Sequence, residues 1–404
     1  MDNSVNCLTT TREINKKEEG ERGFQIIDGK LYYKGEMVGD SKNQPGFPRL
    51  NFIEESVGSG HNAIVFKVKH TYLEVEQIVK IYFPHADNSY GKIQLETQKN
   101  ANVEVEDISA IVYDAGEYAY PIPIHFSIMR YIQNLTFRKW CELREDRFVR
   151  KLTQYKYLDI LDENVAICIH NTINFSAGYL KAVMELYHKG SSHGDMNPGN
   201  ILLEVRDHEY YDVDKIKSFD RLIPDKVRLI DMGTSRLLDN HPQDAAAIRD
   251  VFHIYETIRK ALKIFFEDNN SLKSWLNIEM QKVDKGQYGA DFKLLDKNGE
   301  LISPYELAGD LFRLVCVLSC IMKCEYDYYH PDEMNQEETE PQEKIMDCYE
   351  NFYFYTNEEP YFELFDTCGD VKKTTELFME ANSVGRLVDW DKVEECDLFF
   401  IDWR

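Results

Sequence analysis

The stretch "HGDMNPGNILL", residues 193–203, decides how the fold of this chain is interpreted. Asp195 and Asn200 stand five residues apart on either side of a proline-glycine pair, and three aliphatic residues follow. The aliphatic run predicts a strand, and the polar residues before it predict a loop. Two oxygen-bearing side chains ahead of a strand could share a metal ion, or they could simply form a turn.

The length and charge of the chain limit the classes of protein to consider. Its 404 residues exceed what one hydrophobic core usually fills, so we expect two or three domain-sized units. The 43% hydrophobic and 13% aromatic content is enough to bury a large core. The net charge of -24 repels phosphate backbones and anionic lipids, so we expect no nucleic-acid partner and no membrane insertion.

The N-terminus and the cysteines indicate a cytoplasmic protein. Residues 1–23 lack the apolar core of a signal peptide, and we expect them to be disordered. Nine cysteines without secretory context are expected to stay reduced. Cys316, Cys320 and Cys324 recur every four residues, which favours a buried helix face over a metal site, because paired metal ligands usually stand closer together.

The first half of the chain resembles a small antiparallel sheet that carries one helix. Asp28-Gly29 between apolar runs predicts a hairpin, and ordered structure should begin near Phe24. Residues 63–70 and 76–83 are rich in β-branched and aromatic residues, which predicts two strands. A helix is expected around residues 90–103, and further strands within 119–132.

The second half has mainly helical patterns. Residues 175–190 and 244–266 have apolar residues at helical spacing, and a capping signature starts a third helix at Ser303 and extends it to about Cys324. Two predicted strands flank residues 206–224, which form either a surface insertion or an ordered hairpin. From Pro331 to the end there are 21 acidic and 6 basic residues, so this region could present an acidic face to a basic partner.

A glycine-rich turn and a lysine point to nucleotide binding. In "VGSGHNAIVFKV", residues 57–68, Gly58 and Gly60 would let backbone amides approach phosphates, although a plain hairpin has the same pattern. Lys80 lies in the next predicted strand and could hold the phosphates if an acidic side chain fixed it. Glu96 is the candidate for this side chain, with Glu104 and Glu106 as weaker rivals; a solvated surface carboxylate is the alternative for Glu96.

Four motifs in this order resemble those of the protein-kinase-like superfamily. They are the glycine loop with Ala63 and Val65, then Lys80, then His193-Gly194-Asp195 with Asn200, and then Asp231-Met232-Gly233. Four linked motifs are far more specific than one. The resemblance covers residues 52–266 and implies an α+β, two-lobed fold that binds ATP and Mg²⁺.

The resemblance also implies a role for each residue. Asp195 would be the catalytic aspartate, with Lys80 and Asn200 completing the catalytic set, and Asn200 and Asp231 would bind Mg²⁺. His193 would be a structural residue of the loop rather than a general base. Asp250 would anchor the catalytic loop, although a simple helix N-terminal charge is the alternative. The residues predicted to contact the nucleotide are Gly58, Ser59, Gly60, Ala63, Val65, Ile78, Lys80, Glu96, Met129, Arg130, Tyr131 and Ile132.

The implied lobes set the domain boundaries. The antiparallel-sheet N-lobe would span residues 24–130, the mainly helical C-lobe core 131–266, and an acidic helical extension of the C-lobe 267–404. Met129 to Ile132 would link the lobes, and their backbone would bind adenine while Val65 and Ile78 cover its ring.

The departures from the family pattern leave three functions open. Gly194 stands where regulated protein kinases carry an arginine, and Asn197 where serine/threonine kinases commonly have lysine. The segment between Asp231 and Asp250 is also too short to leave much room for a bound peptide. The expected enzyme is an ATP-dependent serine/threonine-protein kinase. The alternatives are a small-molecule kinase of the aminoglycoside or choline phosphotransferase type and a non-catalytic binding module.

Overall fold

The computed structural model describes residues 23–59, 63–84, 108–132, 134–144, 163–205, 224–232, 235–237, 245–265, 269–284 and 290–329. The chain divides into two compact units between Ile132 and Gln133. Small antiparallel sheets and helices are both present, so the fold class is α+β, as predicted. No helix in the described ranges is both long enough and apolar enough to cross a membrane.

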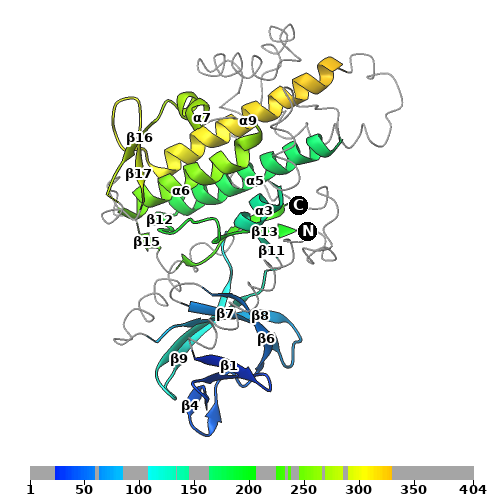
Figure 1. Cartoon of the computed structure of the whole chain (residues 1–404), viewed down its shortest axis with the longest axis vertical. Helices are drawn as coiled ribbons and strands as arrows, with labels where there is room; N and C mark the ends of the chain where they lie inside the picture. The colour runs from blue at the N-terminus through cyan, green and yellow to red at the C-terminus, as the bar shows by residue number, and fades with distance from the viewer. Residues whose placement is uncertain are drawn as a thin grey trace, which may run out of the picture. The chain divides into compact units, whose positions relative to one another are not determined.

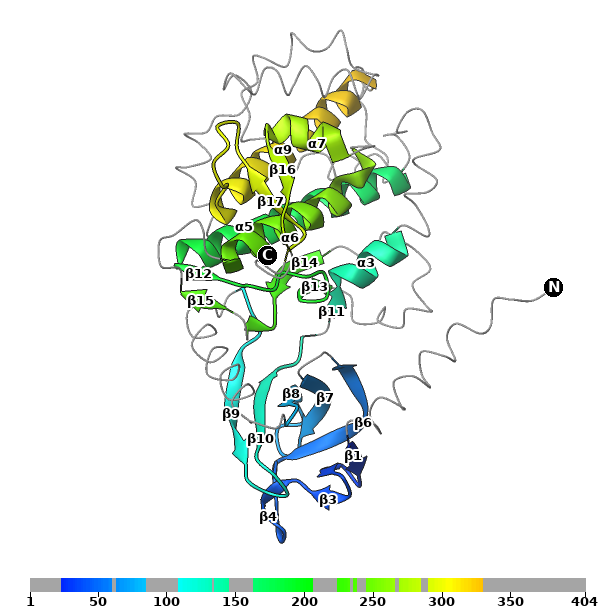
Figure 2. The same ribbon diagram turned by 60° about the vertical axis from the view of Figure 1, so that its left-hand side comes forward.

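The described part of the first unit is built from strands. They are β1 (Phe24–Ile27), β2 (Lys30–Tyr33), β3 (Glu36–Met37), β4 (Gly39–Ser41), β5 (Gln44–Pro45), β6 (Leu50–Ser59), β7 (Ala63–His70), β8 (Glu76–Tyr82), β9 (Val112–Tyr118) and β10 (Ile124–Arg130). A five-stranded antiparallel sheet has the order β6-β7-β8-β10-β9 (Figure 2). The helix predicted around residues 90–103 lies outside the described residues.

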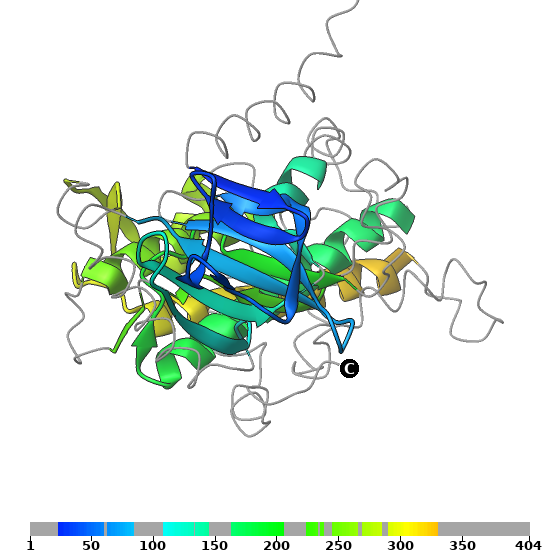
Figure 3. The ribbon, with the colours of Figure 1, turned by 90° about the horizontal axis from the view of Figure 1, so that it is seen from below.

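Two further sheets, β1-β2-β3 and β4-β5, precede the five-stranded sheet, whereas the sequence predicted a single small one. The predicted hairpin at Asp28-Gly29 is confirmed. It joins β1 to β2, and both turn residues have positive φ, 50° and 70°, as a tight two-residue hairpin requires. Figure 3 shows the dark-blue strands of this hairpin lying over the larger sheet.

One face of the five-stranded sheet forms the core of the first unit. Ile64, Phe66 and Val68 of β7 alternate with residues of the other face and are at most 2% exposed. They pack in one cluster with Val79 and Ile81 of β8, and with Phe24 and Leu31 from the β1-β2 hairpin. This alternation leaves Val65 and Lys80 on the opposite face.

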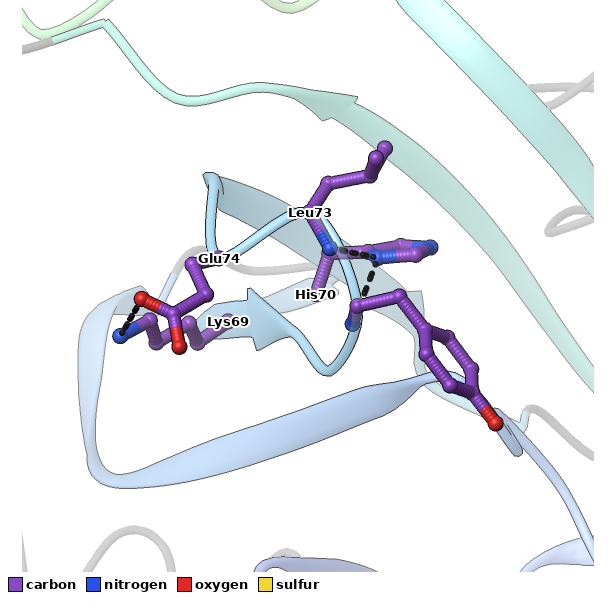
Figure 4. A network of polar contacts seen from close by, with 5 residues as sticks. Lys69, His70, Leu73 and Glu74 are labelled. Carbon is purple, nitrogen blue, oxygen red and sulfur yellow. Dashed lines mark hydrogen bonds and ion pairs between the residues drawn. The ribbon is translucent and has the colours of Figure 1, made fainter.

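The turn between β7 and β8 is held by side chains of its own residues. The His70 Nδ1 accepts the backbone N–H groups of Tyr72 and Leu73, at 3.3 and 3.1 Å (Figure 4). Glu74 has a φ of 56°, and its carboxylate lies 3.7 Å from the Lys69 ammonium. These contacts lie within an exposed turn, in which the Tyr72 and Leu73 side chains are 79% and 67% exposed.

The second unit combines helices with short strands. Its elements are β11 (Asn134–Thr136), α3 (Phe137–Arg144), α5 (Glu163–His188), β12 (Ser191–Ser192), β13 (Ile201–Val205), β14 (Pro224–Leu229), β15 (Arg236–Leu237), α6 (Ala245–Ala261), the 3₁₀ helix η5 (Leu262–Ile264), α7 (Asn269–Leu276), β16 (Glu279–Lys282), β17 (Phe292–Leu295) and α9 (Pro304–Tyr329). The long helices α5, α6 and α9 lie side by side (Figure 1).

The three helices predicted in the second half of the chain are present, and α5 starts earlier than its pattern indicated. Phe175, Tyr179 and Leu186 are fully buried, and Gly190 follows the helix with a φ of 73°, as predicted for a closing glycine. The predicted strands around residues 206–224 are β13 and β14, which pair antiparallel. The connection between them, residues 206–223, lies outside the described residues.

The region after residue 266 is not purely helical, which corrects the prediction of a helical extension. Strands β16 and β17 form an antiparallel hairpin in it. Their short runs, "EMQK" and "FKLL", are too short for a helical period to be recognised, and pairing between them decides their structure. The acidic region from Pro331 onwards lies outside the described residues.

The predicted start of the third helix is confirmed. The Ser303 Oγ accepts the Glu306 N–H at 3.2 Å, and the Glu306 carboxylate accepts the Ser303 N–H at 3.1 Å. This reciprocal pair is a capping box, with Pro304 at the first helical position. The helix continues to Tyr329, so it includes the three cysteines at four-residue spacing.

Candidate functional site

The loop of residues 193–200 lies between two short strands of the second unit. Strand β12 enters it and pairs with β15, and β13 leaves it. The Asn197 carbonyl accepts the Asn200 N–H at 2.9 Å, which closes a turn around Pro198-Gly199. The Asn197 side chain accepts the Gly199 N–H at 2.9 Å inside this turn. The turn therefore brings Asn200 back toward Asp195.

Asp195 and Asn200 are in direct contact. The Asn200 Nδ2 donates to the Asp195 carbonyl at 2.9 Å and to its Oδ2 at 3.2 Å. Because both partners can only accept, the amide must be oriented with Nδ2 toward Asp195 and Oδ1 away from it. The contact between the two side chains therefore does not use the Asp195 Oδ1 or the Asn200 Oδ1.

Asp231 is placed beside Asn200 by the pairing of β13 with β14. The Ile230 N–H donates to the Asn200 carbonyl at 2.9 Å, so Asp231 follows directly after this contact. Asp231 has a φ of 63°, a conformation that is uncommon outside glycine and that aspartate adopts more readily than most residues. Such backbone conformations concentrate at functional sites. The structure therefore brings the predicted Asp195, Asn200 and Asp231 to one end of this strand pair.

The loop is anchored to helix α6 by Asp250, which is fully buried. Its carboxylate accepts the N–H of His193 at 2.8 Å and the N–H of Gly194 at 2.9 Å. It also accepts the Tyr187 hydroxyl at 2.6 Å. The prediction that Asp250 anchors the loop is confirmed, and the alternative of a simple helix-terminal charge is excluded by its burial.

Burial raises the pKa of the Asp250 carboxyl. The hydrogen bonds from the Gly194 N–H, the Tyr187 hydroxyl and the His193 N–H act in the opposite direction. Each of these hydrogen bonds is donated to the carboxylate, so the site is built to hold its ionised form. Removing any donor would leave a buried charge with fewer partners.

The side chain of His193 supports the loop, as predicted, and is fully buried. Its Nδ1 accepts the Asp195 N–H at 3.2 Å, and its Nε2 lies 2.9 Å from the Ile230 carbonyl. Because Nδ1 accepts a hydrogen bond and Nε2 faces a carbonyl oxygen, the hydrogen of the ring must be on Nε2. His193 thus links the loop to the strand that precedes Asp231.

Arg249 and Tyr187 complete the support of the loop, and the sequence did not single out either. The Arg249 guanidinium donates to the Gly194 carbonyl at 2.7 Å, opposite the N–H that Asp250 holds. Gly194 has a φ of 76°, which explains glycine at this position. The only signal available in the sequence was that Arg249 is next to Asp250.

We expect His253 to make the stability of the second unit depend on pH. It lies on α6 four residues after Arg249. Burial lowers its pKa below the usual value near 6.5, although the charges of Asp250 and Asp195 oppose this shift. Because the folded pKa is the lower one, stability is complete above the unfolded pKa and is lost as pH falls below it.

The free energy of unfolding should therefore fall between pH 7.5 and 5.5 more steeply for the wild type than for His253→Gln. The difference amounts to about 1.4 kcal/mol for each unit between the two pKa values. Urea denaturation at a series of pH values measures it. His188→Gln, at the exposed end of α5, is the control and should keep the wild-type slope. Parallel curves for the wild type and His253→Gln would contradict the assignment.

In the first unit, the face of the sheet opposite the core carries the residues predicted to bind the nucleotide. Directly opposed residues of antiparallel strands share one face. One row across the sheet is Gly58, Val65, Lys80 and Ser127, and the next includes Ile78 and Met129. Lys80 is 5% exposed, and its ammonium lies 5.1 Å from the centre of the Tyr82 ring. Apolar side chains and a lysine thus lie together on this face.

Packing does not require a glycine at position 58. A Cβ added there would meet no atom within 4 Å, and Gly58 does not have a positive φ. Gly58→Val should leave the melting temperature unchanged but weaken ATP binding at least about 10-fold, because the side chain would stand where a nucleotide approaches the backbone. Isothermal titration measures the affinity. Gly309→Ala, which also meets open space, is the control; equal affinities for all three proteins would contradict the prediction.

The predicted linking segment, residues 129–132, ends the first unit. The Arg130 N–H donates to the Ile111 carbonyl at 2.9 Å, and the binding of adenine by the backbone of this segment stays a prediction. The Lys67 ammonium lies 4.3 Å from the centre of the Tyr131 ring, and Ile132 is 7% exposed. Ile111 directly precedes β9, which pairs with β10 up to Met129, so the Arg130 bond continues this pairing by one step.

Of the remaining predicted residues, some lie within the described ranges and others outside them. Ser59 ends β6 and is exposed, and Ala63 starts β7 and is buried. Gly60 and Glu96 lie outside the described residues, as do Glu104 and Glu106. The acidic partner of Lys80 therefore stays a prediction.

The donor set suits a magnesium ion that is bound together with phosphates. Among the described residues, no group of three or more His, Cys, Asp and Glu side chains could hold a metal ion. Asn200 and Asp231 offer one amide oxygen and a carboxylate. Mg²⁺ is usually bound by one or two protein oxygens, with water and substrate phosphates completing its shell. The two residues thus fit this ion if a nucleotide supplies the other ligands.

No protein-family model matches the chain, and no curated protein matches it.

Proposed function

We propose that this protein is an ATP- and Mg²⁺-dependent phosphotransferase of the protein-kinase-like superfamily, which phosphorylates serine or threonine hydroxyls of another protein. The observation that carries the proposal is the contact between Asp195 and Asn200, beside Asp231, in a loop that Asp250 anchors. The fold proposed is two-lobed, with the units on either side of Ile132 as the lobes.

Each residue has a role that its surroundings support. The Asp195 carboxylate, oriented by Asn200, would accept the proton of the attacking hydroxyl. Asn200 and Asp231 would hold Mg²⁺, and Lys80 with the amides around Gly58 would offset phosphate charge. When bound, ATP with Mg²⁺ supplies the γ-phosphoryl group and a leaving group whose charge the metal reduces. Val65, Ile78 and Met129 offer an apolar surface for the base.

A small-molecule kinase is the second candidate. Its specific support is Asn197, whose side chain caps its own turn and offers no cation to a peptide substrate. Gly194 no longer favours this candidate, because its positive φ already explains the glycine. A non-catalytic binding module is the third candidate, although Lys80, Asp195, Asn200 and Asp231 are all retained.

One experiment separates the three candidates. The purified full chain is incubated with γ-labelled ATP and Mg²⁺, alone, with cell-lysate proteins and with small metabolites. Asp195→Ala and Lys80→Ala serve as matched inactive controls. Label on polypeptides from the wild type alone supports the protein kinase, and label on metabolites alone supports the second candidate. ATP binding with equal background label in all three proteins would leave only the binding module.

A further inference from the structure

Ser127 is a buried polar residue of the first unit that the proposed function does not use. It lies on β10, directly opposite Lys80 of β8, so its side chain shares the face that carries Val65 and Lys80. Its exposed fraction is 0%. In the described structure its hydroxyl has no hydrogen-bond partner.

A buried hydroxyl without a partner costs free energy, because it has given up its hydrogen bonds to water. Its neighbour His125, also on β10, differs in this respect: the His125 Nδ1 lies 3.3 Å from the Glu117 carboxylate. Alanine could occupy position 127 of β10 without the free-energy cost of a buried hydroxyl that has no partner. The hydroxyl is therefore explained if another molecule supplies the missing partner.

The position of Ser127 indicates which molecule this is. It lies between Lys80, opposite it on the next strand, and Met129, two residues along its own strand and on the same face. These two residues are assigned above to the phosphates and to the base. Both have unbranched side chains, which can rotate to admit a ligand to this face of the sheet.

We infer that Ser127 is a binding residue for the nucleotide and hydrogen-bonds it on the Lys80 side of the base. This inference rests on the proposed function and adds a contact that the sequence motifs do not predict. A serine hydroxyl both donates and accepts, so it can meet a nitrogen of the base or an oxygen of the phosphates.

Ser127→Ala tests the inference in the full chain. We expect ATP binding to weaken about 2–10-fold, the loss typical of one neutral hydrogen bond. The melting temperature without ligand should stay the same or rise, because the buried hydroxyl is gone. Ser127→Cys keeps the volume but bonds weakly, and should lose affinity similarly. Ser41→Ala, on exposed β4, is the control and should bind as the wild type does.

Titrations with ATP and with adenosine locate the contact. Weaker binding of both ligands assigns the hydroxyl to the base, and weaker binding of ATP alone assigns it to the phosphates. Unchanged affinity for both, with a raised melting temperature, would overturn the inference while leaving the proposed function intact. A wild type that binds neither ligand would remove the proposed function as well.

Discussion

Replacing Asp195 by asparagine is expected to slow phosphate transfer by about 10²–10⁴-fold, the usual contribution of a positioned proton acceptor. The amide keeps the shape of the side chain but cannot accept the proton of the attacking hydroxyl. ATP affinity should change little, because no role in nucleotide binding is assigned to Asp195. Steady-state kinetics and isothermal titration measure the two quantities.

The same substitution should barely affect folding. Asp195 is partly exposed, and among the described residues Asn200 is the one donor to its carboxylate. Its backbone bond to His193 is kept in the variant. The free energy of unfolding should change by no more than about 0.5 kcal/mol.

Asp28→Asn is a matched control for this substitution. It makes the same chemical change in the β1-β2 turn, where asparagine also tolerates a positive φ. Its transfer rate should equal that of the wild type. A wild-type rate in Asp195→Asn would rule out the assigned role, whereas a large loss of stability would make the rate uninformative.

Asp250→Ala is expected to cause the largest loss of stability, about 3–5 kcal/mol, because three buried donors lose their acceptor at about 1–3 kcal/mol each. The backbone N–H groups of His193 and Gly194 and the Tyr187 hydroxyl would all lose their acceptor. The loop that carries Asp195 would lose its anchor, so transfer activity should fall too. Urea denaturation measures the stability.

Tyr187→Phe keeps this prediction testable if Asp250→Ala does not fold. It removes one hydrogen bond to a charged group, which is worth about 1.5–3 kcal/mol. Combined with Asp250→Asn, the two substitutions should be non-additive, because they disrupt the same contact. Additive effects, or a Tyr187→Phe variant as stable as the wild type, would contradict the network.

The elements best predicted from sequence are those that local chemistry determines. The bounds of β7 match the prediction, because alternating β-branched residues specify a strand that is buried on one face. The Asp28-Gly29 turn and the Ser303 capping box followed for the same reason, since the residues involved are three positions apart or fewer. Of the candidate site, the sequence identified Asp195, Asn200, Asp231 and Asp250, which the structure brings to one loop and its supports.

What the sequence could not predict depends on contacts between distant residues. Tyr187 is 63 residues from Asp250, and nothing in its local pattern distinguishes it from Tyr179 on the same helix. The hydrogen bond of the Arg130 amide depends on the pairing of β9 with β10, and the position of Ser127 opposite Lys80 depends on the register between β10 and β8. The strands β16 and β17 are too short to show a period of their own.

The backbone N–H and carbonyl of Gly194 are held by neighbouring positions of one helix, since Asp250 accepts from the N–H and Arg249 donates to the carbonyl. The loop is irregular in backbone, but two side chains of α6 hold it at this point, so we expect it to open together with its contacts to that helix. Hydrogen exchange at the Gly194 amide should thus be as slow as in the middle of a packed helix. The backbone of Asp195, the next residue, should be held in place by the same two contacts.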